Sequence, residues 1–341
     1  MKFSIGMGST LRTDEVATHA KAAEDAGFAE LTLVDTPTIS RDVHVMMMLA
    51  AQATRNIRIA QGVVDPGSIH PSVIANLSAT IDELSGGRVF VGIGTGNPVA
   101  KVRKPVPLKE LAESVEFIKA FTAGEPATYQ GLTFQSRWAR RQLPIYVSAH
   151  GPRSLRLAGA IADGVIFLAT DPIYAKWQVD LIHRGAVEAG RDPAEIDTWA
   201  RTMIYITDDK ESAREQLASY PASYKDLHKM LSRDDPDVHA LRLAMDGVEP
   251  GRSEKLIADS RRFDEVFEIE QAEQIGAPHS QSVSWRLIDL WHLYGTPDEI
   301  VSRIDDLAAV GVRTISITIY TILDTLRLIN DVGEKVISRY R

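Results

Sequence analysis

The feature that most constrains the fold is an alternation of strand-like and helix-like segments along most of the chain. Apolar runs predict eight strands, at residues 3–5, 31–34, 57–64, 89–93, 145–148, 165–168, 200–207 and 314–319. Helical spacing of apolar residues follows most of these runs. This alternation is typical of a (β/α)8 TIM barrel, which is the α/β fold that we predict. A doubly wound sheet stays open, because periodicity alone does not show that the sheet closes.

Two stretches exceed what a minimal barrel needs. The chain has 341 residues, whereas a typical barrel has about 250. Residues 125–142 contain strand-like residues around Gly131, and residues 208–293 are mostly polar and helix-like. We therefore expect one domain over residues 1–341, with a helical insertion at about 208–293 between the seventh and eighth strands.

The composition excludes several classes of protein. The 38 basic and 46 acidic residues give a net charge of −8, which disfavours a general nucleic-acid binder. The absence of cysteine excludes disulfides and thiolate chemistry. The N-terminal residues lack the apolar core of a signal peptide, and the longest apolar run, 45–51, has seven residues, where a membrane span needs about 20. We expect a cytoplasmic protein without membrane contact.

Candidate functional residues follow the predicted strands, because barrel active sites form at the carboxyl ends of strands. Asp35 and Asp65 follow the second and third strands, either as functional carboxylates or as caps of the following turns. Glycines at 92, 94 and 96 allow close approach of a ligand, or form a simple turn. Their G-x-G-x-G spacing, followed by Asn97 and a proline, does not match the dinucleotide fingerprint.

The loop after the fifth strand combines small residues with the start of a helix. Residues 148–154 read SAHGPRS, and free backbone N–H groups at a helix start bind phosphate well. An ordinary loop with a helix cap is the alternative. The nine histidines show no HExxH spacing, so we expect no metal site.

Several of these motifs together resemble the bacterial luciferase-like superfamily of flavin- and deazaflavin-dependent oxidoreductases. They are LSGGRVFVGIGTG at 84–96, LPIYVSAHGPRSL at 143–155 and GTPDEI at 295–300. The resemblance covers residues 1–207 and 294–320. Within the superfamily, the chain looks most like the branch that uses coenzyme F420, of which methylene-tetrahydromethanopterin reductase is the best-known member.

The resemblance implies the site residues. Gly62–Val63 matches the position of a non-prolyl cis peptide behind the flavin ring, Asp35 lies near the ring, and residues 148–151 hold the phosphate of the cofactor. The implied cofactor-binding set is Asp35, Gly62, Val63, Thr95, Gly96, Asn97, Ser148, Ala149, His150 and Gly151.

Departures from the family pattern leave the acid or base open. Thr36 stands where many deazaflavin members have His, and Asn97 stands where the glucose-6-phosphate dehydrogenase type has Glu. Our candidates for proton transfer are Asp65, His70 and His150.

The function that the resemblance implies is hydride transfer between C5 of coenzyme F420 and a small organic substrate. An FMN-dependent monooxygenase that takes reduced flavin from a partner reductase and uses O₂ is the alternative. A flavin-binding carrier without turnover and a barrel enzyme without flavin also stay open. Members of the family are often dimers, so we expect a homodimer.

Overall fold

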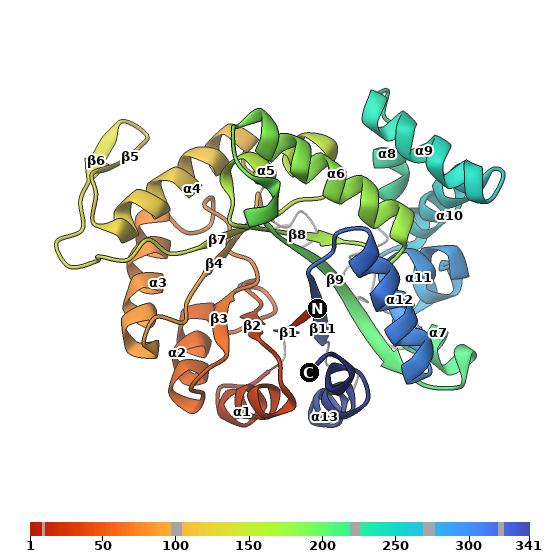
Figure 1. The fold of residues 1–341 in the computed structure, drawn as a ribbon, viewed down its shortest axis with the longest axis horizontal. Coiled ribbons are helices and arrows are strands. Elements are labelled where there is room, and N and C mark those ends of the chain that lie inside the picture. Colours follow the sequence, from red (N-terminus) through yellow and green to blue (C-terminus); the bar gives the residue numbers. More distant parts are fainter. Residues whose placement is uncertain (9–10, 97–103, 219–225, 269–276, 320–323) are drawn as a thin grey trace.

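The computed structural model describes residues 1–8, 11–96, 104–218, 226–268, 277–319 and 324–341. Eight parallel strands surround a common axis (Figure 1). They are β1 (Lys2–Met7), β2 (Glu30–Leu33), β3 (Arg58–Gln61), β4 (Val91–Ile93), β7 (Ile145–Ser148), β8 (Gly164–Leu168), β9 (Asp197–Ile206) and β11 (Thr314–Ile319). Their order is β3-β2-β1-β11-β9-β8-β7-β4. Two isolated bridges, Ile59 with Val89 and Val64 with Ile93, then join the β3 and β4 segments. The predicted TIM barrel is confirmed.

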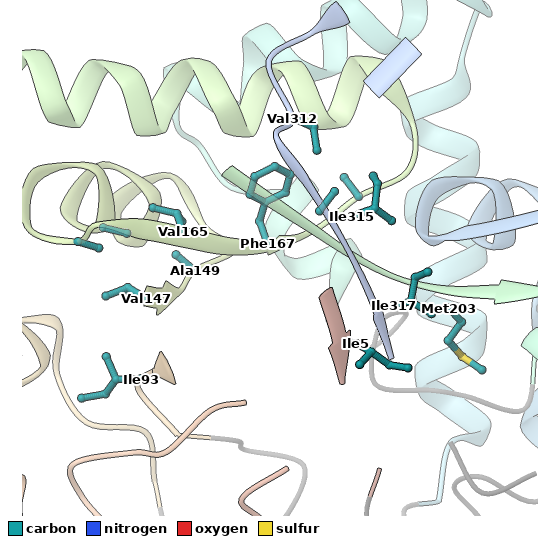
Figure 2. Close-up of a cluster of buried hydrophobic side chains, with 14 of the residues drawn as sticks. Ile5, Ile93, Val147, Ala149, Val165, Phe167, Met203, Val312, Ile315 and Ile317 are labelled. Carbon is teal, nitrogen blue, oxygen red and sulfur yellow. The ribbon is translucent and has the colours of Figure 1, made fainter. Parts of the chain in front are cut away.

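Helices cover the outside of the barrel (Figure 1). They are α1 (Val16–Ala26), α2 (Val43–Ala53), α3 (Pro71–Ser85), α4 (Leu108–Ala123), α5 (Pro152–Ile161), α6 (Pro172–Glu188), α12 (Pro297–Ala309) and α13 (Thr325–Lys335), with short 3-10 turns η1 (Pro193–Glu195) and η4 (Ile337–Tyr340). Between strands and helices lies a large apolar core, to which Val147, Phe167 and Ile317 belong (Figure 2).

A separate small cluster fills the inside of the barrel. Its members come from four strands and from the residue preceding β4: Ala60, Phe90, Tyr146, Ile166 and Trp199. Their rings meet at an angle, with the Phe90 and Trp199 centroids 5.6 Å apart. Since side chains alternate along a strand, the residues two positions further along these strands belong to the next layer, toward the carboxyl ends.

A charged layer lies at the amino ends of the strands. The Glu30 side chain is 1 % exposed, and its Oε1 lies 3.4 Å from Arg58 Nη1 and 3.7 Å from Lys2 Nζ. Lys2 also pairs with Asp197, which accepts a hydrogen bond of 3.2 Å from the Tyr146 hydroxyl. Burial raises the pKa of Glu30 to about 7, although Lys2 and Arg58 oppose the shift. This layer is separated from the functional rim by the aromatic cluster.

The stretch 125–142, with its strand-like residues around Gly131, contains a β-hairpin. Strands β5 (Ala127–Tyr129) and β6 (Leu132–Phe134) pair antiparallel. The two residues between them, Gln130 and Gly131, have φ of 49° and 79°, as a tight hairpin turn of type I′ requires.

The insertion is largely helical, as predicted. It contains α7 (Lys210–Leu217), α8 (Leu227–Leu231), α9 (Pro236–Val248), α10 (Arg252–Val266), η3 (Pro278–Ser282) and α11 (Trp285–Trp291). The end of the stretch differs from the prediction, because β10 (His292–Gly295) is a strand that pairs parallel with residues 203–206 of β9. The reason is that the pairing of β9 with β8 and β11 ends at Thr202. The backbone groups of the remaining residues of β9 therefore need another partner.

No helix within the described ranges is long and apolar enough to cross a bilayer.

Candidate functional site

The predicted site residues follow four neighbouring barrel strands at their carboxyl ends. Asp35 comes two residues after β2, Gly62 directly after β3, Thr95 two residues after β4 and Ala149 directly after β7. In a parallel barrel these ends form one rim. Asn97 lies outside the described residues.

The peptide bond between Gly62 and Val63 is cis, as the family resemblance implied. The Gly62 N–H donates to the Leu33 carbonyl at 2.7 Å. A Cβ on Gly62 would lie 2.7 Å from Cβ of Thr32, so the backbone approaches β2 as closely as only glycine allows.

Val63, Gly94 and Ser148 meet at the rim. A Cβ on Gly94 would lie 3.1 Å from Val63 Cγ2 and 3.6 Å from Ser148 Cβ. Gly96, with φ of 105°, lies beside Asp65, whose carboxyl carbon is 3.4 Å from the Cβ position of Gly96. The glycines therefore let the ends of β3, β4 and β7 pack closely together, and Val63, Thr95 and Ser148 stay half-buried at this edge.

The Asp65 carboxylate holds its own turn. Its Oδ1 accepts hydrogen bonds of 2.9 Å from the backbone N–H groups of Gly67 and Ser68, and its Oδ2 accepts one of 2.8 Å from the Ser68 hydroxyl. The sequence left open whether Asp65 is a functional carboxylate or a cap of the following turn, and these contacts are those of a turn cap.

His70 contacts the start of α3 and the β5–β6 hairpin. Its Nδ1 accepts from the backbone N–H of Ser72 at 3.2 Å and so caps the start of α3. The ring packs edge-on against Tyr129 and Phe134 of the β5–β6 hairpin, with centroid distances of 5.2 and 6.1 Å.

His150 and Arg201 share one electrostatic environment. His150 is exposed to solvent, yet partial desolvation of its ring, and then the positive charge of Arg201, lower the pKa of His150 to about 4. The imidazole is therefore neutral at neutral pH. Arg201 comes from β9 and crosses the barrel interior, where its Nη1 donates to the Gly62 carbonyl at 3.4 Å.

The sequence analysis missed Arg201. Arg201 lies in the predicted strand 200–207, but only the observed start of β9 at Asp197 places Trp199 on the same strand and face. Because Trp199 points into the barrel, Arg201 on the same face of β9 points into it as well.

Asp35 is half-buried at the rim. Burial, followed by the negative charges of Asp42 and Asp65, raises the pKa of the Asp35 carboxyl to about 6. Asp35 therefore exchanges its proton close to neutral pH, which a catalytic acid or base requires.

The β7–α5 loop contains the remaining candidates. Ser148 is half-buried, Ala149 is buried, and Gly151 is the residue from which α5 begins. The Gly151 N–H donates to the Ser154 hydroxyl at 3.1 Å. The first N–H groups of any helix lack partners within it and attract anions, so this loop fits a phosphate.

Within the described ranges, no three His, Asp or Glu side chains gather closely enough to hold a metal ion.

Comparison with known proteins identifies the family. Residues 2–314 match the model of the family described as luciferase-like monooxygenase. The chain belongs to this family. The resemblance read from the sequence motifs is thereby confirmed.

Of three proteins similar to this chain, two are named as F420-dependent. The chain is 30 % identical over 332 residues to 5,10-methylenetetrahydromethanopterin reductase of Archaeoglobus fulgidus, covering 92 % of each chain. It is 33 % identical over 224 residues to an F420-dependent hydroxymycolic acid dehydrogenase of Mycobacterium tuberculosis, covering 60 % of this chain and 62 % of the relative. The solved structure of coenzyme F420 dependent tetrahydromethanopterin reductase from Methanopyrus kandleri superposes with a TM-score of 0.74 at 26 % identity, covering 100 % of this chain and 99 % of that one.

Proposed function

We propose that the protein is a coenzyme F420-dependent oxidoreductase that transfers a hydride between C5 of the deazaflavin and a small organic substrate. The observation that carries this proposal is the similarity to methylenetetrahydromethanopterin reductase along nearly the whole of both chains. The barrel alone would not support it, since one fold serves many activities.

The described residues fit a flat heterocycle with a phosphate tail. Half-buried Val63 and Thr95, at the closely packed ends of β3 and β4, suit contact with a ring, and Ser148 and Gly151 at the start of α5 suit the phosphate. When bound, the deazaflavin accepts or donates the hydride. The chain orients the two reactants and excludes water between them.

Proton transfer to or from the substrate falls to one of the rim residues. Of Asp65, His70 and His150, we favour His150, because the other two hold a turn and a helix start through their side chains. Neutral His150 accepts a hydrogen bond at one ring nitrogen and donates one at the other. Asp35 is a further candidate, with a pKa of about 6.

The FMN-dependent monooxygenase is the second candidate, supported by the family's description. In that case a partner reductase supplies reduced flavin, and O₂ is the second substrate.

Parallel titration of the purified protein with coenzyme F420 and with reduced FMN, followed by fluorescence, tests the proposal. We expect tighter binding of F420 and reduction of bound F420 by a substrate without O₂ uptake. Preference for reduced FMN together with O₂ uptake would establish the monooxygenase instead. Binding of neither cofactor would refute both.

We further propose that the chain is one domain and forms a homodimer in the cytoplasm. Four large apolar side chains on the adjacent helices α2 and α3 are 43–49 % exposed: Val45, Met48, Val73 and Leu84. Such exposure on neighbouring helices supports a self-association surface. Light scattering of the wild type and of Met48→Glu tests it, and an equal mass for the two proteins would contradict it.

A further inference from the structure

Arg233, in the segment between α8 and α9, reaches from the insertion to the β7–α5 loop. Its Nη1 lies 3.3 Å from the position that a Cβ on Gly151 would take. The guanidinium is exposed, and within the described ranges no carboxylate or carbonyl accepts a hydrogen bond from it. A cation from the insertion thus lies directly against the start of α5.

The location is electrostatically unfavourable for a cation by itself. The start of a helix carries a partial positive charge from its aligned peptide dipoles, and the Arg233 guanidinium adds a full one. Two positive groups side by side become favourable when an anion binds between them.

Tyr174, the third residue of α6, adds the hydroxyl of a buried side chain to the same location. The residue is 2 % exposed, and its ring is fixed by stacking on Trp177 at 5.6 Å and by an edge contact with Trp291 at 5.3 Å. Burial raises the pKa of this phenol, and the charge of Arg233 opposes the rise, so the two groups act on each other. No residue of the described part of the chain hydrogen-bonds to the hydroxyl. The hydroxyl is not among the fully buried unpartnered polar atoms, so it is open to a ligand and can donate a hydrogen bond to an anion.

The insertion is anchored close to Arg233. Four residues further on, Asp237 Oδ1 accepts from Arg184 of α6 at 2.8 Å, and its other oxygen pairs with Arg156 of α5. The indole N–H of Trp177 donates to the Asp237 carbonyl at 2.8 Å. These contacts tie α9 to the two helices that supply the loop and the tyrosine, and so fix where Arg233 lies.

We propose that Arg233 and the Tyr174 hydroxyl bind the phosphate in the tail of the cofactor, together with the first N–H groups of α5. The insertion then contributes a residue to the cofactor site. This inference rests on the proposed function, because it takes the cofactor to be coenzyme F420.

Two ligands separate the tail from the ring: coenzyme F420, and the deazaflavin riboside that lacks the phosphate tail. Dissociation constants are measured by fluorescence for the wild type, Arg233→Gln, Tyr174→Phe and Lys229→Gln. Lys229 is the matched control, because it is an exposed cation of the same insertion whose Nζ pairs with Asp226 at 2.6 Å. Thermal unfolding of each variant checks that it is folded.

We expect Arg233→Gln to raise the Kd of F420 on the order of tenfold, since hydrogen bonds to charged groups are the strong ones, and Tyr174→Phe to raise it less. The Kd of the riboside stays at its wild-type value in both variants, and Lys229→Gln changes neither ligand. The dependence of the F420 Kd on salt weakens in Arg233→Gln, because one charge pair is lost.

The failures are distinguishable. If the wild type binds neither ligand, the proposed function is wrong. Two results would overturn this inference while the proposed function stands, provided that the wild type binds F420. One is that Arg233→Gln leaves the Kd of F420 and its salt dependence unchanged. The other is that Arg233→Gln raises the Kd of the riboside as much as that of F420.

Discussion

The contact between α5 and α6 gives the sharpest prediction about stability. Gly185 of α6 faces α5, where a Cβ would lie 2.0 Å from the Arg156 carbonyl oxygen and 2.7 Å from its Cα. Contacts under 3.0 Å are essentially never seen for a real Cβ, and the atoms in the way are backbone. In Gly185→Ala the two helices must therefore separate by about 1 Å.

The cost follows from two opposing effects. Overpacking costs about 1–3 kcal/mol, and the rigid backbone contact puts this case at the upper end. Alanine returns about 1 kcal/mol as the better helix former. We expect the free energy of unfolding to fall by about 2 kcal/mol. Because α5 begins at Gly151, the Kd of the cofactor rises as well.

Urea unfolding followed by circular dichroism measures the change, and Gly247→Ala is the control. Gly247 is also helical, in α9, but its added Cβ would meet no atom within 4 Å. There only the helix preference acts, so stability rises by about 1 kcal/mol. If Gly185→Ala were as stable as Gly247→Ala, the close approach of the two helices would be refuted.

Three further predictions concern charged groups. The folded protein holds the Glu30 proton more tightly than the unfolded chain, so the stabilisation is complete below pH 4.5 and is lost as pH rises through about 7. The loss amounts to about 3 kcal/mol in the wild type. In urea titrations at several pH values, Glu30→Gln abolishes this pH dependence. An unchanged dependence would show that Glu30 is not its cause. Arg201→Gln raises the pKa of His150 above about 4, as followed by NMR of the ring protons, and a fixed value would exclude contact between the two charges. Asp237→Asn weakens the pairing of two partly exposed arginines, so the free energy of unfolding falls by about 1 kcal/mol. Calorimetry showing no change would mean that the insertion is held elsewhere.

The barrel was predictable because each of its units carries its own local signal. Apolar β-branched runs such as 57–64 and 314–319 predict strands without knowledge of their partners. The ends of these strands then share a rim by topology alone, which is why Asp35, Gly62 and Ser148 were chosen correctly as rim residues.

The contacts that needed the folded chain were not predictable. Whether Asp65 caps a turn depends on where the N–H groups of Gly67 and Ser68 point. The strand character of β10 depends on an unpaired edge of β9, and the approach of Arg233 to Gly151 joins residues far apart in sequence. No local pattern records such pairings.

The barrel closes unevenly. Between β3 and β4 it is joined only at Ile59 with Val89 and at Val64 with Ile93, while the other neighbours share continuous ladders. Amide hydrogens along this seam are the first that we expect to exchange with solvent when the barrel opens locally. Val63 and Gly94, on opposite sides of the seam, also form the proposed ring site. A ligand that contacts both residues holds the β3 and β4 segments together, so we expect its binding to slow hydrogen exchange along the whole seam.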